Sequence, residues 1–103
     1  MTWIVAASPA AETDIADAVD WYEERSPGLG RRFLSDIQSL IDRIADNPLQ
    51  YALVYRDARH ALLRRFPYAL IFRIEENEVR VLACYHTSRN PRRWRARVRG
   101  RAG

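Results

Sequence analysis

Two segments of this chain repeat apolar side chains at the spacing of a single helix face. In the first segment the intervals are four, three, one and three residues, at Ala11, Ile15, Ala18, Val19 and Tyr22. The second segment repeats these intervals at Phe33, Ile37, Leu40, Ile41 and Ile44. The periodicity predicts two amphipathic helices, each with one face that must be buried against another part of the protein.

Residues that favour helix ends flank both segments. Ser8 is a good N-cap, and Pro9 suits the first helical position because its missing N–H would have no partner there. We therefore expect the first helix to cover residues 9–25. The stretch "SPGLG" (26–30) interrupts the pattern, and the second helix should end before Pro48, since the residue before a proline avoids helical conformation. The short connection predicts an antiparallel helix hairpin.

Later segments alternate apolar and polar residues in the manner of β-strands. Shared faces are predicted within 68–75 for Tyr68, Leu70, Phe72 and Ile74, and within 78–87 for Val79, Val81, Ala83 and Tyr85. The link around Asn77 is short and polar, so these two strands should pair as a hairpin. Residues 2–8 and 61–66 are further predicted strands, and the second would place Arg64 and Arg65 on opposite faces.

This order of elements predicts an α+β domain. An N-terminal strand and an antiparallel helix hairpin would pack on a small, mostly antiparallel sheet, with residues 48–60 irregular. We expect one domain over residues 1–97 and a flexible, basic C-terminal tail over residues 98–103. The sheet face away from the helices should be partly solvated, because it carries Arg73, Arg80 and His86.

Charge is divided unevenly along the chain. Residues 1–50 contain nine acidic residues and four arginines, whereas residues 51–103 contain thirteen arginines and four acidic residues. All 17 lysine-or-arginine positions are arginine, which excludes lysine chemistry. Guanidinium groups bind phosphates and carboxylates through paired hydrogen bonds. The basic half therefore predicts an anionic macromolecular partner.

The sequence indicates a cytoplasmic protein without a membrane partner, metal or cofactor. Cys84 is the single cysteine, so no internal disulfide is possible. No apolar run approaches the ~20 residues that a membrane helix needs. His60 and His86 are far apart and have no cysteines nearby, and no phosphate-binding or dinucleotide-binding motif is present.

The first predicted helix carries acids and an aromatic pair outside its apolar stripe. Asp14, Asp17 and Asp20 follow one another at intervals of three, which we interpret as a solvated helix face rather than a catalytic carboxylate pair. Tyr22 belongs to the apolar stripe. Trp21 lies one residue off it, and is a candidate for a partner-binding surface.

The segment "HTSRNPRRWRAR" (86–97) concentrates charge at the end of the last predicted strand. Its first residues are of types that favour turns, and Trp94 is a large apolar group suited to docking on the sheet. We therefore interpret the segment as ordered. A cluster of arginine, histidine and aromatic groups can bind phosphate. Because RNA supplies its own 2′-hydroxyl nucleophile, and His86 has a side chain suited to proton transfer, such a cluster can also cleave RNA without a metal.

In combination these segments resemble one known family. The stretch "DWYEERSPGLGRRFL" (20–34), the corner "FPYALIFRIE" (66–75) and the pattern H-x-x-R-x-P-x-x-W-x-x-R from His86 to Arg97 are similar to the RelE/ParE superfamily of type II toxin–antitoxin toxins. The ParE-like, plasmid-stabilisation branch is the nearer one. The resemblance covers about residues 3–97, and implies a helix hairpin packed on a small antiparallel sheet.

The resemblance implies a growth-inhibiting toxin that poisons DNA gyrase and is neutralised by a cognate antitoxin. An acidic, partly disordered antitoxin segment would bind the basic half and form a hetero-oligomer with it. Predicted target-binding residues are His86, Arg89, Arg92, Arg93, Trp94 and Arg97. Predicted antitoxin-binding residues are Trp21, Arg64 and Arg73.

Two other functions stay open on the sequence. A RelE-like toxin would be a metal-independent endoribonuclease that cleaves messenger RNA on the ribosome. Its candidate catalytic residues here are Arg64, Tyr85, His86 and Arg89, although the chain lacks the lysines of the RelE pattern. A non-toxic module that binds a partner or nucleic acid is the third class.

Overall fold

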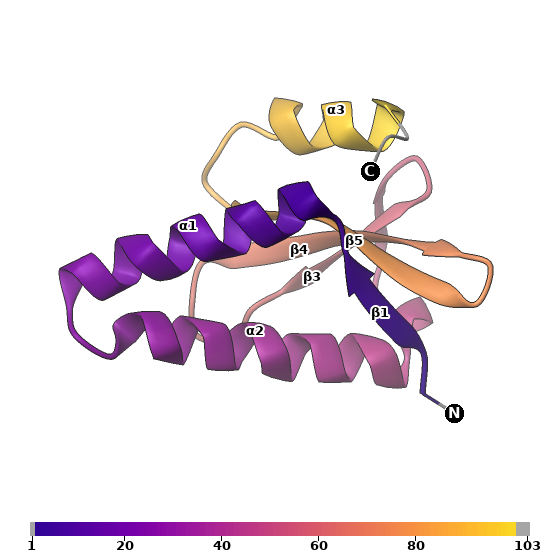
Figure 1. Ribbon diagram of the computed structural model, residues 1–103. Helices are drawn as coiled ribbons and strands as arrows, with labels where there is room; N and C mark the ends of the chain where they lie inside the picture. The colour runs from indigo at the N-terminus through magenta and orange to yellow at the C-terminus, as the bar shows by residue number, and fades with distance from the viewer. Residues whose placement is uncertain (1, 101–103) are drawn as a thin grey trace.

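A five-stranded sheet runs through the molecule in the order β1-β5-β4-β3-β2 (Figure 1). The computed structural model describes residues 2–100. The strands are β1 (Ile4–Ala7), β2 (Leu53–Tyr55), β3 (Ala58–Leu62), β4 (Tyr68–Glu75) and β5 (Glu78–His86). β1 pairs with β5 in parallel, and the other neighbours are antiparallel. The predicted α+β class and mostly antiparallel sheet are confirmed.

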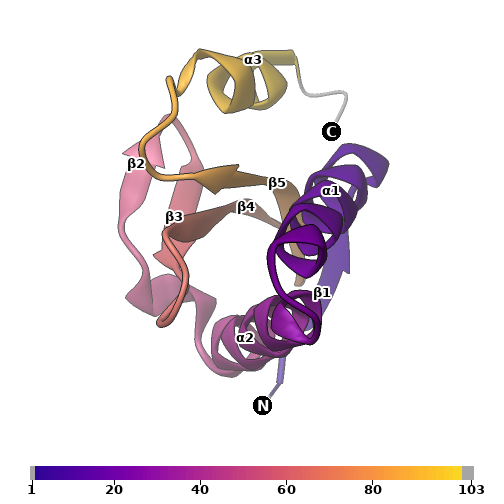
Figure 2. The same cartoon turned by 90° about the vertical axis from the view of Figure 1, so that its left-hand side faces the viewer.

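Helices cover both faces of this sheet. The helices are α1 (Pro9–Arg25), α2 (Leu29–Asp46) and α3 (Arg92–Gly100), and a 3₁₀ turn, η1, spans Pro48–Gln50. α1 and α2 form the predicted hairpin on one face, whereas α3 lies across the other (Figure 2). Within residues 2–100, no helix combines the length and apolar character needed to cross a membrane.

The ends of the helix hairpin follow from local chemistry. The Ser8 hydroxyl accepts a hydrogen bond from the Ala11 N–H at 3.1 Å, as expected of an N-cap. At the turn, Gly28 has a φ of 89°, a left-handed conformation that glycine adopts without strain. The Glu23 carboxylate accepts from the N–H groups of Gly28 at 2.9 Å and Gly30 at 3.0 Å. One acid of α1 therefore caps the start of α2.

The main core lies between the helix hairpin and the sheet. Its fully buried side chains include Phe33, Leu40, Ile44, Leu70, Phe72 and Val79. The apolar stripes of both helices and the alternation of β4 thus point to this layer, as the periodicity predicts. Burial of these stripes, rather than helix propensity, supplies most of the stability of such helices.

A second core lies under α3 and corrects two predictions. It contains Ala58, Ile71, Leu82, Ala83, Trp94 and Val98. The sheet face that we expected to be partly solvated is therefore covered, and Arg73 is only 7% exposed. The predicted tail boundary at residue 97 is also wrong, because α3 continues to Gly100 and Val98 is 2% exposed. Residues 101–103 of that tail lie outside the described residues.

A bulge in β5 corrects the predicted alternation of that strand. Ile71 pairs with Ala83 but Phe72 pairs with Val81, so Leu82 is an extra residue opposite β4. Because one inserted residue reverses the faces of a strand, Val81 faces the helix hairpin whereas Ala83 faces α3. The same shift turns Cys84 toward the main core.

The connection between α2 and β4 is more ordered than expected. Residues 48–60 contain η1, β2 and the start of β3, and the β2–β3 turn includes Arg56 at a φ of 53°. Such a short ribbon depends on the neighbouring β4 and carries little sequence signal. β3 ends at Leu62, so Arg64 and Arg65 lie in a turn and not on opposite faces of a strand.

Candidate functional site

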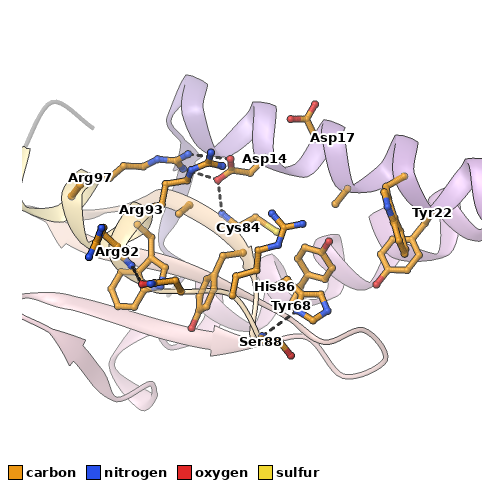
Figure 3. A pocket seen from close by; sticks show the side chains of 18 residues that line it. Asp14, Asp17, Tyr22, Tyr68, Cys84, His86, Ser88, Arg92, Arg93 and Arg97 are labelled. Carbon is orange, nitrogen blue, oxygen red and sulfur yellow. Dashed lines mark hydrogen bonds and ion pairs between the residues drawn. The ribbon is translucent and has the colours of Figure 1, made fainter.

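A groove of about 1010 Å³ separates α1 from α3 above the last residues of β5 (Figure 3). Asp14, Asp17 and Trp21 line it from α1. Arg92, Arg93, Trp94 and Arg97 line it from α3. Cys84, Tyr85, His86 and Arg89 contribute from β5 and the following loop. The groove therefore has an acidic wall, a basic wall and a strand for its floor.

The floor is a strand edge without a strand partner. Pairing between β1 and β5 ends at Ala7 and Val81, and the Ser8 N–H donates to the Val81 carbonyl at 2.9 Å as the chain turns into α1. Beyond that point side chains supply partners to β5. The Cys84 N–H donates to the Asp14 carboxylate at 3.0 Å, and Arg97 donates to the Leu82 carbonyl at 2.9 Å.

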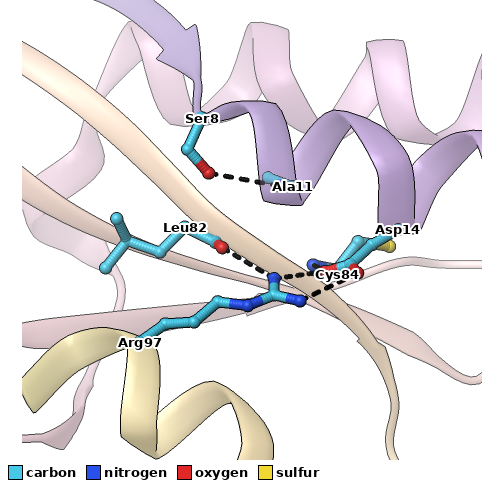
Figure 4. A network of polar contacts seen from close by, with 6 residues as sticks. All are labelled: Ser8, Ala11, Asp14, Leu82, Cys84 and Arg97. Atoms are coloured by element: carbon cyan, nitrogen blue, oxygen red, sulfur yellow. Dashed lines mark hydrogen bonds and ion pairs between the residues drawn. The ribbon is translucent and has the colours of Figure 1, made fainter. Parts of the chain in front are cut away.

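Asp14 and Arg97 also pair directly across the groove (Figure 4). Arg97 Nη1 lies 2.6 Å from Asp14 Oδ2, and Nη2 lies 3.1 Å from Oδ1, a two-point contact between guanidinium and carboxylate. The hydrogen bonds to Asp14 raise the pKa of Arg97 above its usual value. Arg97, expected to contact a target, is thus engaged within the protein.

Aromatic packing holds α3 on the sheet. Trp94 is 4% exposed, and its ring centroid lies 5.6 Å from that of Tyr85 and 6.1 Å from that of Tyr55. The expectation that Trp94 docks on the sheet holds, but a side chain so buried is not itself a surface for target contact. Asn90 Oδ1 accepts from the Arg92 N–H at 2.9 Å, which orders the start of the helix.

Three arginines stay exposed beside the groove: Arg89, Arg92 and Arg93. We call them the arginine surface. They come from α3, which is docked on the sheet, and from the loop before it, where the Arg89 N–H donates to the His86 carbonyl at 2.9 Å. The cationic groups are therefore presented from ordered backbone rather than from a mobile tail.

His86 lies at the aromatic end of the groove, near Tyr22 and Tyr68 (Figure 3). Its ring centroid is 5.2 Å from that of Tyr68, in an edge-on arrangement. His86 Nδ1 accepts a hydrogen bond from the Ser88 N–H at 3.1 Å. This contact assigns the remaining proton of the neutral ring to Nε2, so neutral His86 can donate a hydrogen bond only from Nε2.

The structure brings together three of the four nuclease candidates. Tyr85, His86 and Arg89 line the groove, and burial raises the pKa of the Tyr85 hydroxyl. Arg64 is exposed in the turn between β3 and β4 and does not line the groove. Burial, with the nearby Asp14 carboxylate, raises the pKa of the Cys84 thiol to about 12, so this cysteine is a poor nucleophile.

The predicted antitoxin contacts do not form one surface. Trp21 is 46% exposed, lines the groove and has the Arg25 guanidinium 3.7 Å from its ring centroid. Arg73 is buried under α3, where it donates to the Val98 carbonyl at 2.9 Å and pairs with Asp57. Arg73 is therefore a structural residue, and of the three candidates only Trp21 belongs to the groove.

Sequence reasoning missed the part that Asp14 plays. The spacing of the acids in α1 predicts a solvated helix face, and Asp17 and Asp20 are indeed exposed. Asp14 differs because it meets Arg97, a residue 83 positions away. No local spacing carries that signal. Within residues 2–100, no group of three or more His, Cys, Asp or Glu is placed to hold a metal ion.

Comparison with known proteins identifies the family. The sequence model of one protein family, described as the ParE toxin of the type II toxin–antitoxin system parDE, matches residues 5–91 of this chain. This chain belongs to the ParE toxin family. Toxin ParE2 of Mycobacterium tuberculosis is 28% identical over 91 residues, which are 87% of each chain.

Solved structures agree on the fold. A chain of the chromosomal ParDE toxin–antitoxin system from P. aeruginosa superposes with a TM-score of 0.76 at 19% identity, over 84% of this chain and 98% of that one. A chain of the toxin–antitoxin complex RelBE2 from Mycobacterium tuberculosis gives 0.58 at 18% identity, over 84% and 99%. The ParE family match ends at residue 91, so α3 lies beyond it.

Proposed function

We propose that this ParE-family toxin inhibits growth by binding a macromolecular target through its arginine surface, and that the target is DNA gyrase. The docking of α3 carries the proposal. Trp94 and Val98 anchor the helix, so Arg89, Arg92 and Arg93 project from a rigid support. Because the backbone that carries them is already ordered, only their side chains lose conformational entropy when they bind an anionic surface.

The same region suits neutralisation by an antitoxin in the cytoplasm. The solved relatives come from toxin–antitoxin systems. An acidic, partly disordered antitoxin segment would complement the arginine surface, and Trp21 would provide an apolar anchor on the opposite wall of the groove. The toxin and antitoxin would then form a hetero-oligomer, in which the arginine surface is shielded from its target.

A second function, endoribonuclease activity, is favoured by one observation. Tyr85, His86 and Arg89 converge on the groove, where they would bind phosphate and move protons. Two features weigh against it. Arg64 lies elsewhere, and the Nδ1 atom of His86 is already occupied by the Ser88 N–H, which leaves neutral His86 without a free basic nitrogen.

Charge reversal on α3 tests the proposed function. The double variant Arg92→Glu/Arg93→Glu should lower growth inhibition and inhibition of gyrase supercoiling by about tenfold or more, because like charges placed across an interface cost several kcal/mol. The matched control is Arg31→Glu/Arg32→Glu, an exposed adjacent pair on α2 with the same charge change. The control should keep full inhibition.

RNA analysis of the same cultures separates the two functions. Primer extension on messenger RNA should show no new ends when the toxin is induced. Cuts in the messenger RNA at fixed positions within codons, with the supercoiling activity of gyrase unaffected, would reject gyrase as the target. If such cuts vanish in His86→Ala while antitoxin binding persists, the endoribonuclease function is the correct one.

A further inference from the structure

Three elements meet at the carboxylate of Asp14. Asp14 lies in α1, receives the Cys84 N–H of β5 at 3.0 Å and pairs with Arg97 of α3 at 2.6 and 3.1 Å. Arg97 in turn donates to the Leu82 carbonyl of β5 at 2.9 Å (Figure 4). The pair thus ties α1, β5 and α3 together at the point where β5 has lost β1 as its neighbour.

The contact between Asp14 and Arg97 is directional, whereas the apolar packing of α3 on the sheet is not. Trp94 and Val98 hold α3 on the sheet through burial, which is favourable but not directional, and the hydrogen bond from Arg73 to the Val98 carbonyl fixes only the C-terminal end of the helix. A two-point contact between guanidinium and carboxylate does fix an orientation, because both pairs of atoms must align. The side chains of Arg97 and Asp14 are 24% and 19% exposed, so solvent weakens the contact less than at an open surface.

The orientation of Arg97 determines where the arginine surface faces. Arg93 precedes Arg97 by four residues, and residues four apart lie on the same side of a helix. Both side chains line the groove. Rotation or sliding of α3 would therefore carry Arg93 away from the groove together with Arg97.

We infer that Asp14 is a positioning residue, which sets the orientation of α3 and of its arginine surface through Arg97. What that surface binds rests on the proposed function, but the positioning itself does not. Asp17 provides the contrast. It lies three residues further along α1 and lines the same groove, yet it is exposed, and within residues 2–100 no ion pair joins it to α3.

Hydrogen exchange of the free toxin tests this inference. The variant Asp14→Asn keeps an oxygen that can accept from the Cys84 N–H but loses the charge that pairs with Arg97. We expect amide protection in α3 to fall by about tenfold or more, since hydrogen bonds to charged groups contribute more to stability than neutral ones do. Amides of β4 should keep their protection. Asp17→Asn, with the same change of charge, should leave α3 unchanged.

Two further variants distinguish positioning from general stabilisation. Asp14→Glu retains the carboxylate and should restore most of the protection of α3. In an Arg97→Gln background, Asp14→Asn should cause no further loss, because the two residues act as one unit. Unchanged α3 protection in Asp14→Asn, or an equal loss in β4, would overturn the inference. Should Asp14→Asn not fold, Arg97→Gln alone replaces it, since it removes the other half of the pair, and α3 protection equal to that of the unmodified toxin would overturn the inference.

Growth assays of the same variants keep the two proposals distinct. If Asp14→Asn releases α3 and toxicity falls, while Asp17→Asn remains toxic, both proposals are supported. If Asp14→Asn releases α3 and toxicity is unchanged, positioning stands and the arginine surface is not the target contact. If α3 stays protected, positioning fails whatever the toxicity.

Discussion

At the scale of single residues, Glu23 shows how one side chain can connect two helices. Its carboxylate accepts the N–H groups of Gly28 and Gly30, which belong to the turn and to the first turn of α2. These hydrogen bonds lower the pKa of Glu23 below its ordinary value of 4.5. Gly30 permits the approach, since a β carbon there would lie 2.7 Å from the Val19 carbonyl oxygen.

The lowered pKa of Glu23 predicts a pH dependence of stability. Because the folded protein holds Glu23 ionised more strongly than the unfolded chain does, its contribution is fully present above pH 4.5 and is lost as pH falls through the lower pKa of the folded state. We expect Glu23→Gln to reduce the urea midpoint at pH 7, and the difference from the unmodified protein to shrink in acid.

Glu24→Gln is the matched control for this prediction, since Glu24 is an exposed neighbour on α1. It should leave the urea midpoint unchanged at both pH values. A difference between Glu23→Gln and the unmodified protein that stays constant from pH 7 down to pH 3 would contradict the capping role.

At the scale of elements, α3 depends on the sheet for its existence. Nine residues are too few for a stable isolated helix in water, and α3 carries five arginines on the segment 92–99. Burial of Trp94 and Val98 against the sheet offsets the low intrinsic stability of this short helix. The sheet needs α3 as well, because α3 covers Ile71, Leu82 and Ala83.

Truncation of Trp94 should therefore release the helix. We expect Trp94→Ala to lower the free energy of unfolding by about 3 kcal/mol, the usual cost of removing a buried aromatic side chain. Urea denaturation followed by circular dichroism measures this. Arg92→Ala, an exposed residue of the same helix, should change the midpoint little. Equal midpoints for Trp94→Ala and the unmodified protein would mean that α3 does not dock through this residue.

At the scale of the whole molecule, Cys84 reports on the integrity of the main core. It is 6% exposed, faces the helix hairpin, and has a thiol pKa raised to about 12. Because the thiolate is the reactive form, alkylation at pH 8 should be very slow in the native protein. We expect the rate of labelling by iodoacetamide to rise with urea in parallel with unfolding measured by circular dichroism. Rapid labelling without urea would contradict this expectation, and would show that iodoacetamide reaches the Cys84 thiol from the groove in the native protein.

The sequence predicted those features that local periodicity and end signals define. The bounds of α1, the end of α2 before Pro48 and the β4–β5 hairpin all follow from contacts between near neighbours. The family assignment also followed from ordered motifs, such as the segment from His86 to Arg97, and the ParE family model confirms it. By contrast, β2 and β3 were predicted poorly, because a three-residue strand is stabilised by its neighbour and not by its own pattern.

Sequence by itself thus determined an α+β fold, a helix hairpin, and a basic segment after the last strand with a tryptophan that could anchor it. Only the tertiary structure decided which charges are free. It buried Arg73, paired Arg97 with Asp14, and left Arg89, Arg92 and Arg93 exposed. The reason is physical. Helix periodicity depends on residues only a few positions apart. The ion pair between Asp14 and Arg97 joins residues 83 positions apart, and it forms only once the sheet brings α1 and α3 together.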